Sequence, residues 1–267
     1  MTRIGHDSDH DVVVTPAGQR IGLSWSGLTD IGKRRAVNED SLVTKPPIFA
    51  VADGMGGHSA GDVASAAVVT RLAGEAAARF TARGALDRAL RRAVVDIERR
   101  AGHSDLGTGT TVTGVALTLV GDEPYWLVFN IGDSRVYRQT TSRGLERLTI
   151  DHSVVQELVD AGEITADEAD GHPQSNIITR AVGFNELPVP DYRLVPLDPG
   201  SRLLLCSDGL TKEVGEKKIA AVLAHGRPAS ATAGDLVELA LGGGGRDNVT
   251  VVVVDVAPFP GAAHGEG

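Results

Sequence analysis

The chain has 267 residues, of which 42% are hydrophobic, enough to build a sizeable core. Its 26 lysine and arginine residues are outnumbered by 35 aspartate and glutamate residues, which gives a formal net charge of −9. This acidic balance argues against a nucleic-acid-binding protein, because neutralising phosphates requires clustered basic residues. Apolar runs such as 249–254 are far shorter than the roughly 20 residues that cross a bilayer, which argues against a membrane protein.

The two ends of the chain and its single cysteine bear on where the protein works. The start of the chain has no apolar segment of the kind found in signal peptides, so we expect none. We expect residues 1–22 to form a solvated, acidic N-terminal extension and residues 257–267 to form a flexible C-terminal tail. Cys206 cannot form an internal disulfide, which fits a cytoplasmic location, and its apolar neighbours place it in the core.

Between these ends, strand-like and helix-like segments follow one another. Runs rich in β-branched residues and bounded by Gly, Pro or Asp predict strands at 48–52, 112–120, 125–131, 202–207 and 249–256. Helical patterns occur at 61–80, 84–101, 151–161, 216–224 and 230–240. The connections 120–124 and 131–135 have the length of hairpin turns, which is too short for parallel crossovers. We therefore expect an α+β protein with antiparallel strands.

Carboxylates stand where several of these predicted strands begin or end. The set comprises Glu39, Asp40, Asp53, Asp133, Asp208 and Asp247. Taken singly, an Asp-Gly pair after a strand most often marks only a turn. Taken together, these acids all lie where a rigid strand meets a loop, which is the usual place for functional groups.

If these strand ends converge, the shared cleft cannot stay fully ionised unaided, because like charges raise one another's pKa. Oxygen ligands without His or Cys favour Mg²⁺ or Mn²⁺ over zinc, and the histidines show no zinc-ligand spacing. Such a set suits a two-metal hydrolytic centre, with ions about 3.5–4 Å apart that activate a bridging water. Arg34 and Arg35 could supply the anion-binding group, since guanidinium pairs with phosphate in a fork.

Eight short blocks occur together and in order: RRAVNEDS (34–41), VADGMGGHSAGDVAS (51–65), GTTVT (109–113), NIGDSRVYR (130–138), LTIDHS (148–153), HPQSNIITRAVG (172–183), LLCSDGL (204–210) and GGRDNVTVVVV (244–254). Together they resemble the metal-dependent protein phosphatases of the PPM (PP2C) class, bacterial branch. The resemblance covers roughly residues 23–256 and implies one phosphatase domain with a flap at about 149–185. It also implies a four-layer α-β-β-α sandwich of two antiparallel sheets flanked by helices.

The resemblance further implies the ligands of two or three Mn²⁺ or Mg²⁺ ions. Asp53 matches the carboxylate that bridges two ions, and the carbonyl of Gly54 matches a ligand of one of them. Asp208 and Asp247 match the ligands of the other ion. Asp133, together with Asp208, matches the site of a third, weaker ion in bacterial members.

The catalytic residues implied by the resemblance are Arg35, Glu39 and Asp40. Arg35 lies four residues before Glu39, as the phosphate-binding arginine of the family does, so we prefer it to Arg34. Glu39 and Asp40 would act mainly through metal-bound waters. Met55 stands where some members carry a histidine general acid, and His58 cannot be assumed to replace it, so leaving-group protonation is unassigned.

The implied activity is hydrolysis of phosphoserine and phosphothreonine monoesters in proteins by a metal-bridged hydroxide. The partners would be phosphorylated proteins and their serine/threonine kinase, and we expect a monomer. Two other functions stay open: a catalytically inactive module that binds phosphoproteins, and a phosphohydrolase for small molecules. Every expected metal carboxylate is present, which argues against the inactive module.

Overall fold

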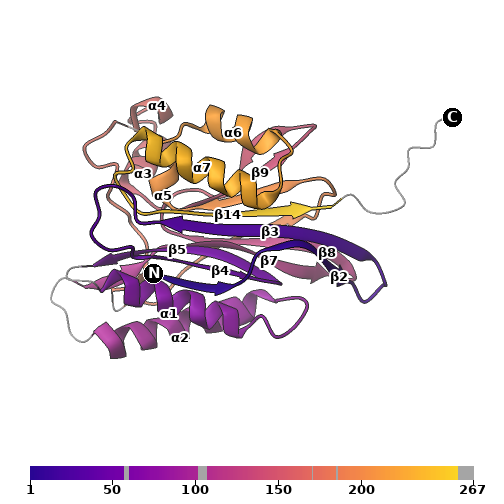
Figure 1. Cartoon of the computed structure of the whole chain (residues 1–267). Coiled ribbons are helices and arrows are strands. Elements are labelled where there is room, and N and C mark those ends of the chain that lie inside the picture. Colours follow the sequence, from indigo (N-terminus) through magenta and orange to yellow (C-terminus); the bar gives the residue numbers. More distant parts are fainter. Residues whose placement is uncertain (57–59, 102–106, 170, 185, 258–267) are drawn as a thin grey trace.

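The computed structural model of the chain describes residues 1–56, 60–101, 107–169, 171–184 and 186–257. Two β-sheets pack face to face, and helices cover the outer face of each (Figure 1). This arrangement confirms the expected α-β-β-α sandwich. His58 and the C-terminal tail beyond residue 257 lie outside the described residues.

The first sheet carries the helices α1 (Gly61–Gly74) and α2 (Arg83–Ala101). Its strands, in spatial order, are β1 (Thr2–Gly5), β4 (Asp40–Lys45), β5 (Ile48–Gly56), β7 (Val112–Val120), β8 (Glu123–Ile131) and β12 (Asp191–Pro196). Beyond this path, β6 (Thr108–Thr110) pairs with the end of β5 and with β11 (Val182–Gly183). All these pairs are antiparallel except that of β1 with β4.

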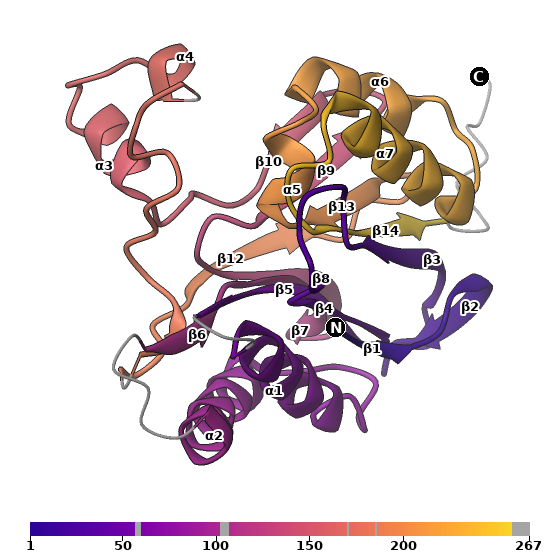
Figure 2. The same cartoon turned by 60° about the vertical axis from the view of Figure 1, so that its left-hand side comes forward.

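The second sheet carries α6 (Glu216–Ala224) and α7 (Ala229–Gly243), with the short α5 (Asp208–Thr211) after one of its strands. Its strands, in spatial order, are β10 (Gly144–Arg147), β9 (Arg135–Thr140), β13 (Arg202–Cys206), β14 (Val249–Val256), β3 (Arg20–Asp30) and β2 (Ser8–Val14). The remaining helices, α3 (Val154–Asp160) and α4 (Ala166–Ala169), project from one end of the sandwich (Figure 2). None of the described helices is long and apolar enough to cross a membrane.

Side-chain alternation along β5 aims one acid at the space between the sheets. Ala50 and Ala52 pack in the core under α1 and α2, whereas Phe49 and Val51 pack in the core between the sheets. Successive side chains of a strand point to opposite faces, so Asp53 continues the series of Phe49 and Val51. Its carboxylate therefore lies on the inner face of the first sheet, at the point where the apolar core ends.

Most predicted elements are confirmed, and several boundaries match to the residue, including those of β7, β14 and α6. The expected helix at 61–80 ends at Gly74 instead. Cys206 is buried in β13, as expected.

The N-terminal residues differ from the expected solvated extension, because β1 joins the first sheet and β2 joins the second. Both strands are partly exposed and carry several polar side chains. They are held by backbone hydrogen bonds, which impose no alternation of apolar and polar residues that the sequence could reveal. Asp7, expected in a solvated tail, accepts hydrogen bonds from Arg3 at 2.6 Å and from the backbone N–H of Gly27 at 3.0 Å.

The connection at 131–135 is not the hairpin that its length predicted. It leaves β8 in the first sheet and enters β9 in the second. Gly132 adopts a positive φ of 106° within it, a conformation that glycine reaches without strain. A short turn can join paired strands or step between packed sheets, and length alone does not distinguish the two. Here the step places Asp133 between the two sheets.

Candidate metal centre

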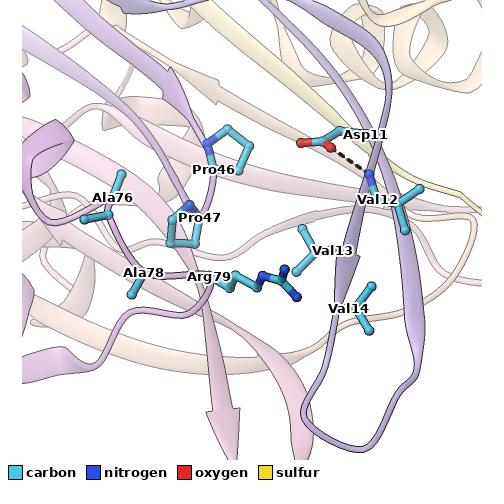
Figure 3. A pocket seen from close by; sticks show the side chains of 10 residues that line it. Asp11, Val12, Val13, Val14, Pro46, Pro47, Ala76, Ala78 and Arg79 are labelled. Carbon is cyan, nitrogen blue, oxygen red and sulfur yellow. Dashed lines mark hydrogen bonds between the residues drawn. The ribbon is translucent and has the colours of Figure 1, made fainter.

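The acidic strand ends meet at one end of the sandwich. Asp40 and Asp53 are direct partners on β4 and β5, at the end of the strands opposite to the Pro46–Pro47 turn. A cavity of about 280 Å³ lies at that opposite turn, but among its lining residues Asp11 is the only acid, and it accepts a hydrogen bond from the N–H of Val12 (Figure 3). The cavity is therefore remote from the acidic cluster.

Asp40 connects the two sheets. It is fully buried, and its Oδ2 accepts hydrogen bonds from Ser207 Oγ at 2.9 Å and Thr250 Oγ1 at 2.6 Å, both from the second sheet's side. Its Oδ1 is buried and has no hydrogen-bond partner among the described residues. Burial raises the pKa of Asp40 to about 7, although the two hydroxyl donors act in the opposite direction.

Asp53 lies on the first sheet's inner face, and its backbone is fixed by Thr111. The Asp53 N–H donates to Thr111 Oγ1 at 3.0 Å, and the Thr111 N–H donates to the Asp53 carbonyl at 2.9 Å. The carboxylate makes no hydrogen bond or ion pair with any residue that the structure describes. Its pKa is raised well above the ordinary value, first by burial and then by the neighbouring charges of Asp40, Asp208, Asp133 and Asp247. These five carboxylates are therefore close enough to one another to interact electrostatically.

Asp208 begins α5 directly after β13 and is nearly buried. Lys212, one helical turn later, forms an ion pair with it, while the buried Asp208 Oδ1 has no hydrogen-bond partner in the described part of the chain. Burial and the charge of Asp208 raise the pKa of Asp133 to about 7, and the ammonium of Lys212 opposes this rise. Lys212 thus compensates part of the negative charge on this side of the cluster.

Arg35 forms a two-point ion pair with Asp247. Its Nε lies 2.8 Å from Oδ1 and its Nη2 donates to Oδ2 at 2.8 Å, while half of the Arg35 side chain stays exposed. The hydrogen bond to Asp247 raises the pKa of Arg35 further above its ordinary value. Arg34 is exposed, and no described residue forms an ion pair with it. The structure therefore places Arg35, and not Arg34, at the cluster.

Glu39 lies at the rim, beside the start of α1. Burial raises its pKa, and a hydrogen bond from the backbone of Gly61 partly offsets that rise. The backbone N–H of Glu39 donates to Asn248 Oδ1 at 2.8 Å, which ties this segment to β14.

Two glycines allow the acid-bearing segments to approach closely. A Cβ on Gly54 would lie 2.1 Å from the carbonyl oxygen of Gly61, and a Cβ on Gly209 would lie 1.9 Å from that of Asn248. Any side chain at either position would force these backbones apart. Both Asp-Gly pairs thus serve close packing as well as turning the chain.

Two residues at the site were missed by sequence reasoning. Asn248 donates from Nδ2 to the carbonyls of Ile31 at 2.9 Å and Val37 at 3.1 Å, which clamps the loop that carries Arg35. Its position next to Asp247 in the sequence is the signal from which its presence at the site could have been predicted. Lys212 stands four residues after Asp208 on a helical turn, and that spacing predicts a shared face.

The donor set fits a hard divalent cation. Two buried carboxylate oxygens, Asp40 Oδ1 and Asp208 Oδ1, have no partner among the described residues, and every candidate donor is an oxygen. In the described residues, however, no three His, Cys, Asp or Glu side chains already stand as a ready ligand group. Two of the carboxylates are instead paired with cationic side chains, Asp247 with Arg35 and Asp208 with Lys212.

Comparison with known proteins assigns the family. The sequence profile of the family described as Protein phosphatase 2C matches residues 33–236. The chain belongs to this family. Among curated family members, the serine/threonine protein phosphatase PstP of Mycobacterium tuberculosis is 40% identical over 246 residues, which cover 89% of this chain and 46% of PstP. The serine/threonine phosphatase Stp of Listeria monocytogenes is 37% identical over 241 residues, which cover 85% of this chain and 93% of Stp.

Solved structures of family members share the fold. The PPM Ser-Thr phosphatase MsPP of Mycobacterium smegmatis, in complex with cacodylate, superposes with a TM-score of 0.79 at 37% identity, covering 92% of this chain and 100% of the chain in that crystal structure. The catalytic domain of PstP, in complex with two manganese ions, superposes with a TM-score of 0.75 at 38% identity, covering 89% of this chain and 99% of that domain. This chain thus spans about half the length of PstP and nearly all of its catalytic domain.

Proposed function

We propose that this chain is a metal-dependent protein serine/threonine phosphatase that hydrolyses phosphoserine and phosphothreonine monoesters. The observation that carries the proposal is the convergence of five carboxylates from two sheets beside one half-exposed arginine, Arg35. Membership of the protein phosphatase 2C family supports it.

The proposed cofactors are two Mn²⁺ or Mg²⁺ ions. Asp53 would bridge them, the carbonyl of Gly54 would bind one, and Asp208 and Asp247 would bind the other. When bound, such ions polarise phosphoryl oxygens and lower the pKa of coordinated water. Asp133 is the proposed additional ligand of a third, weaker ion, and the ammonium of Lys212 would compete with that ion for Asp208.

The chain's own residues orient the substrate. The guanidinium of Arg35 is half exposed and has the fork geometry that matches a phosphate. If Asp247 held a cation, the guanidinium of Arg35 would be free to bind a phosphate. Asp40, bonded to Ser207 and Thr250, fixes the spacing between the two sheets and so between Asp53 and Asp208. Glu39 would hold water at the rim of the site.

The proposed substrates are proteins phosphorylated by a serine/threonine kinase, and the proposed form is a cytoplasmic monomer. The location rests on a single cysteine, Cys206, which is buried as a free thiol.

A side-by-side assay tests the proposal. The purified chain is incubated with Mn²⁺ and a phosphothreonine peptide, a nucleoside monophosphate or a sugar phosphate, and released phosphate is measured. We expect Mn²⁺-dependent hydrolysis, with the highest kcat/KM for the peptide. Binding of the peptide without hydrolysis would favour the inactive module, and faster hydrolysis of either small molecule would favour the small-molecule phosphohydrolase.

A further inference from the structure

Phe184 is the one non-glycine residue with a positive φ in the described part of the chain. Its φ is 55°, a region that bulky side chains avoid. Its backbone N–H donates to the carbonyl of Thr108 at 3.0 Å, which holds it against β6. Strained residues persist only where their surroundings fix them, and they concentrate at ligand sites.

The surroundings that fix Phe184 are two glycines. A Cβ on Gly107 would lie 2.5 Å from the Phe184 ring, and a Cβ on Gly109 would lie 2.3 Å from it. The ring therefore rests in a slot that only glycine leaves open. The side chain is nevertheless 40% exposed, so one part of the ring is packed and another faces solvent.

The ring lies on the same face of the sheet as the candidate metal centre. Gly109 is the cross-strand partner of Met55, and cross-strand partners share a face. Met55 and Asp53 are two residues apart on β5, so their side chains also share a face. Gly54, which lies between them, faces the opposite side of the sheet and packs on Gly61 of α1. Phe184, Met55 and Asp53 thus lie on one face of the sheet.

We propose that Phe184 and Met55 form an apolar subsite that binds an apolar side chain of the protein substrate close to its phosphorylated residue. The inference rests on the proposed phosphatase function and specifies its substrate class. Along β5, Met55 lies about 7 Å from Asp53, and Phe184 is reached across further strands spaced about 4.8 Å apart. An extended substrate advances about 3.3–3.6 Å per residue. A leucine, methionine or aromatic residue two or three positions from the phosphoresidue therefore reaches the subsite.

Selectivity between matched peptides tests the subsite. The reference peptide carries phosphothreonine flanked by alanines, and four variants carry one leucine two or three positions to either side. For the wild-type chain with Mn²⁺, we expect kcat/KM to be about tenfold higher for at least one leucine peptide, which is the effect of burying one apolar side chain. Phe184→Asn keeps a residue that tolerates a positive φ but removes the ring, and this variant should bring the ratio close to one. The matched control is Val95→Asn, which alters an exposed apolar residue of α2 and should keep the wild-type ratio.

The outcomes separate the two proposals. No hydrolysis of any peptide by the wild-type chain would overturn the proposed function itself. Hydrolysis of all peptides with equal kcat/KM, or a leucine preference that survives Phe184→Asn, would overturn only the subsite. If Phe184→Asn fails to fold, Phe184→Gly replaces it, because glycine also adopts this φ and lacks the ring. A purely structural role for Phe184 would lower the melting temperature without changing the peptide ratio.

Discussion

The two sheets contribute carboxylates of different character to the site. On the second sheet's side, Asp247 is paired with Arg35 and Asp208 with Lys212. On the first sheet's side, Asp53 has no cationic partner among the described residues, and Asp40 has only the neutral hydroxyls of Ser207 and Thr250 as donors.

This difference shows which half of the site most needs a metal ion. Arginine and lysine compensate the second half from within the chain, and they can move away because both are partly exposed. In the first half Asp40 is buried and Asp53 is half-buried, and no described cation pairs with either, so we expect their charge to be compensated from outside the chain, since unpaired buried charge is costly. Divalent cations bound between the two sheets would compensate the charge of Asp40 and Asp53. They would also free Arg35 from its ion pair with Asp247.

The largest expected effect comes from removing the uncompensated acid. Asp53→Ala should lower Mn²⁺-dependent hydrolysis of a phosphothreonine peptide by about a thousandfold, because the acid proposed to bridge both ions is lost. Phosphate release and calorimetric titration with Mn²⁺ measure the two consequences. Asp122→Ala, which changes an exposed turn residue, serves as the control. Wild-type turnover by the Asp53 variant would contradict the assignment.

The next effect concerns the arginine that compensates Asp247. Arg35→Ala should raise KM for the phosphopeptide about 10- to 100-fold, the range expected for a lost charge-assisted hydrogen-bond pair. Arg35→Lys should restore only part of the affinity, because lysine lacks the fork. Steady-state kinetics measure both, with Arg34→Ala as the neighbouring control. Equal effects of the two alanine variants would show that Arg35 has no special role.

The lysine that compensates Asp208 should act in the opposite direction. Lys212→Gln removes a cation that competes for this carboxylate, and we expect Mn²⁺ to bind about tenfold more tightly. Calorimetry also gives the number of ions bound, which reveals whether a third ion enters beside Asp133. Lys218→Gln, on the exposed side of α6, should leave Mn²⁺ affinity unchanged. Unchanged affinity in the Lys212 variant would mean that its ammonium does not compete.

The smallest expected effect is on metal-free stability. The pKa of Asp40 and that of Asp133 are each raised from 3.8 to about 7 in the folded chain. Between these values the folded state binds more protons at these two groups than the unfolded state, so their contribution to stability is fully present below about pH 4 and is lost as pH rises through 7. With a chelator present, the melting temperature should fall by several degrees between pH 5 and pH 8, and Asp40→Asn should reduce the slope. A melting temperature that rises over this range would contradict the account.

Much of the site could be predicted because its acids lie at the ends of strands, and these strands are recognisable in the sequence as apolar runs. Asp53 and Asp208 each close an apolar run, and the family motifs then suggest their roles. The strands β1 and β2 could not be predicted, because their pairing relies on backbone groups and their side chains are largely polar. The position of the Phe184 ring could not be predicted either. It depends on Gly107 and Gly109, which lie more than 70 residues earlier in the sequence and contact the ring only in the folded chain.

The central claim is that carboxylates from both sheets hold metal ions together. Anomalous diffraction from a crystal of the wild-type chain grown with Mn²⁺ tests it most directly. We predict two anomalous peaks about 3.5–4 Å apart beside Asp53, with Asp208 and Asp247 turned from Lys212 and Arg35 toward one of them. A map with no peak at these carboxylates, and with both ion pairs intact at millimolar Mn²⁺, would contradict the account.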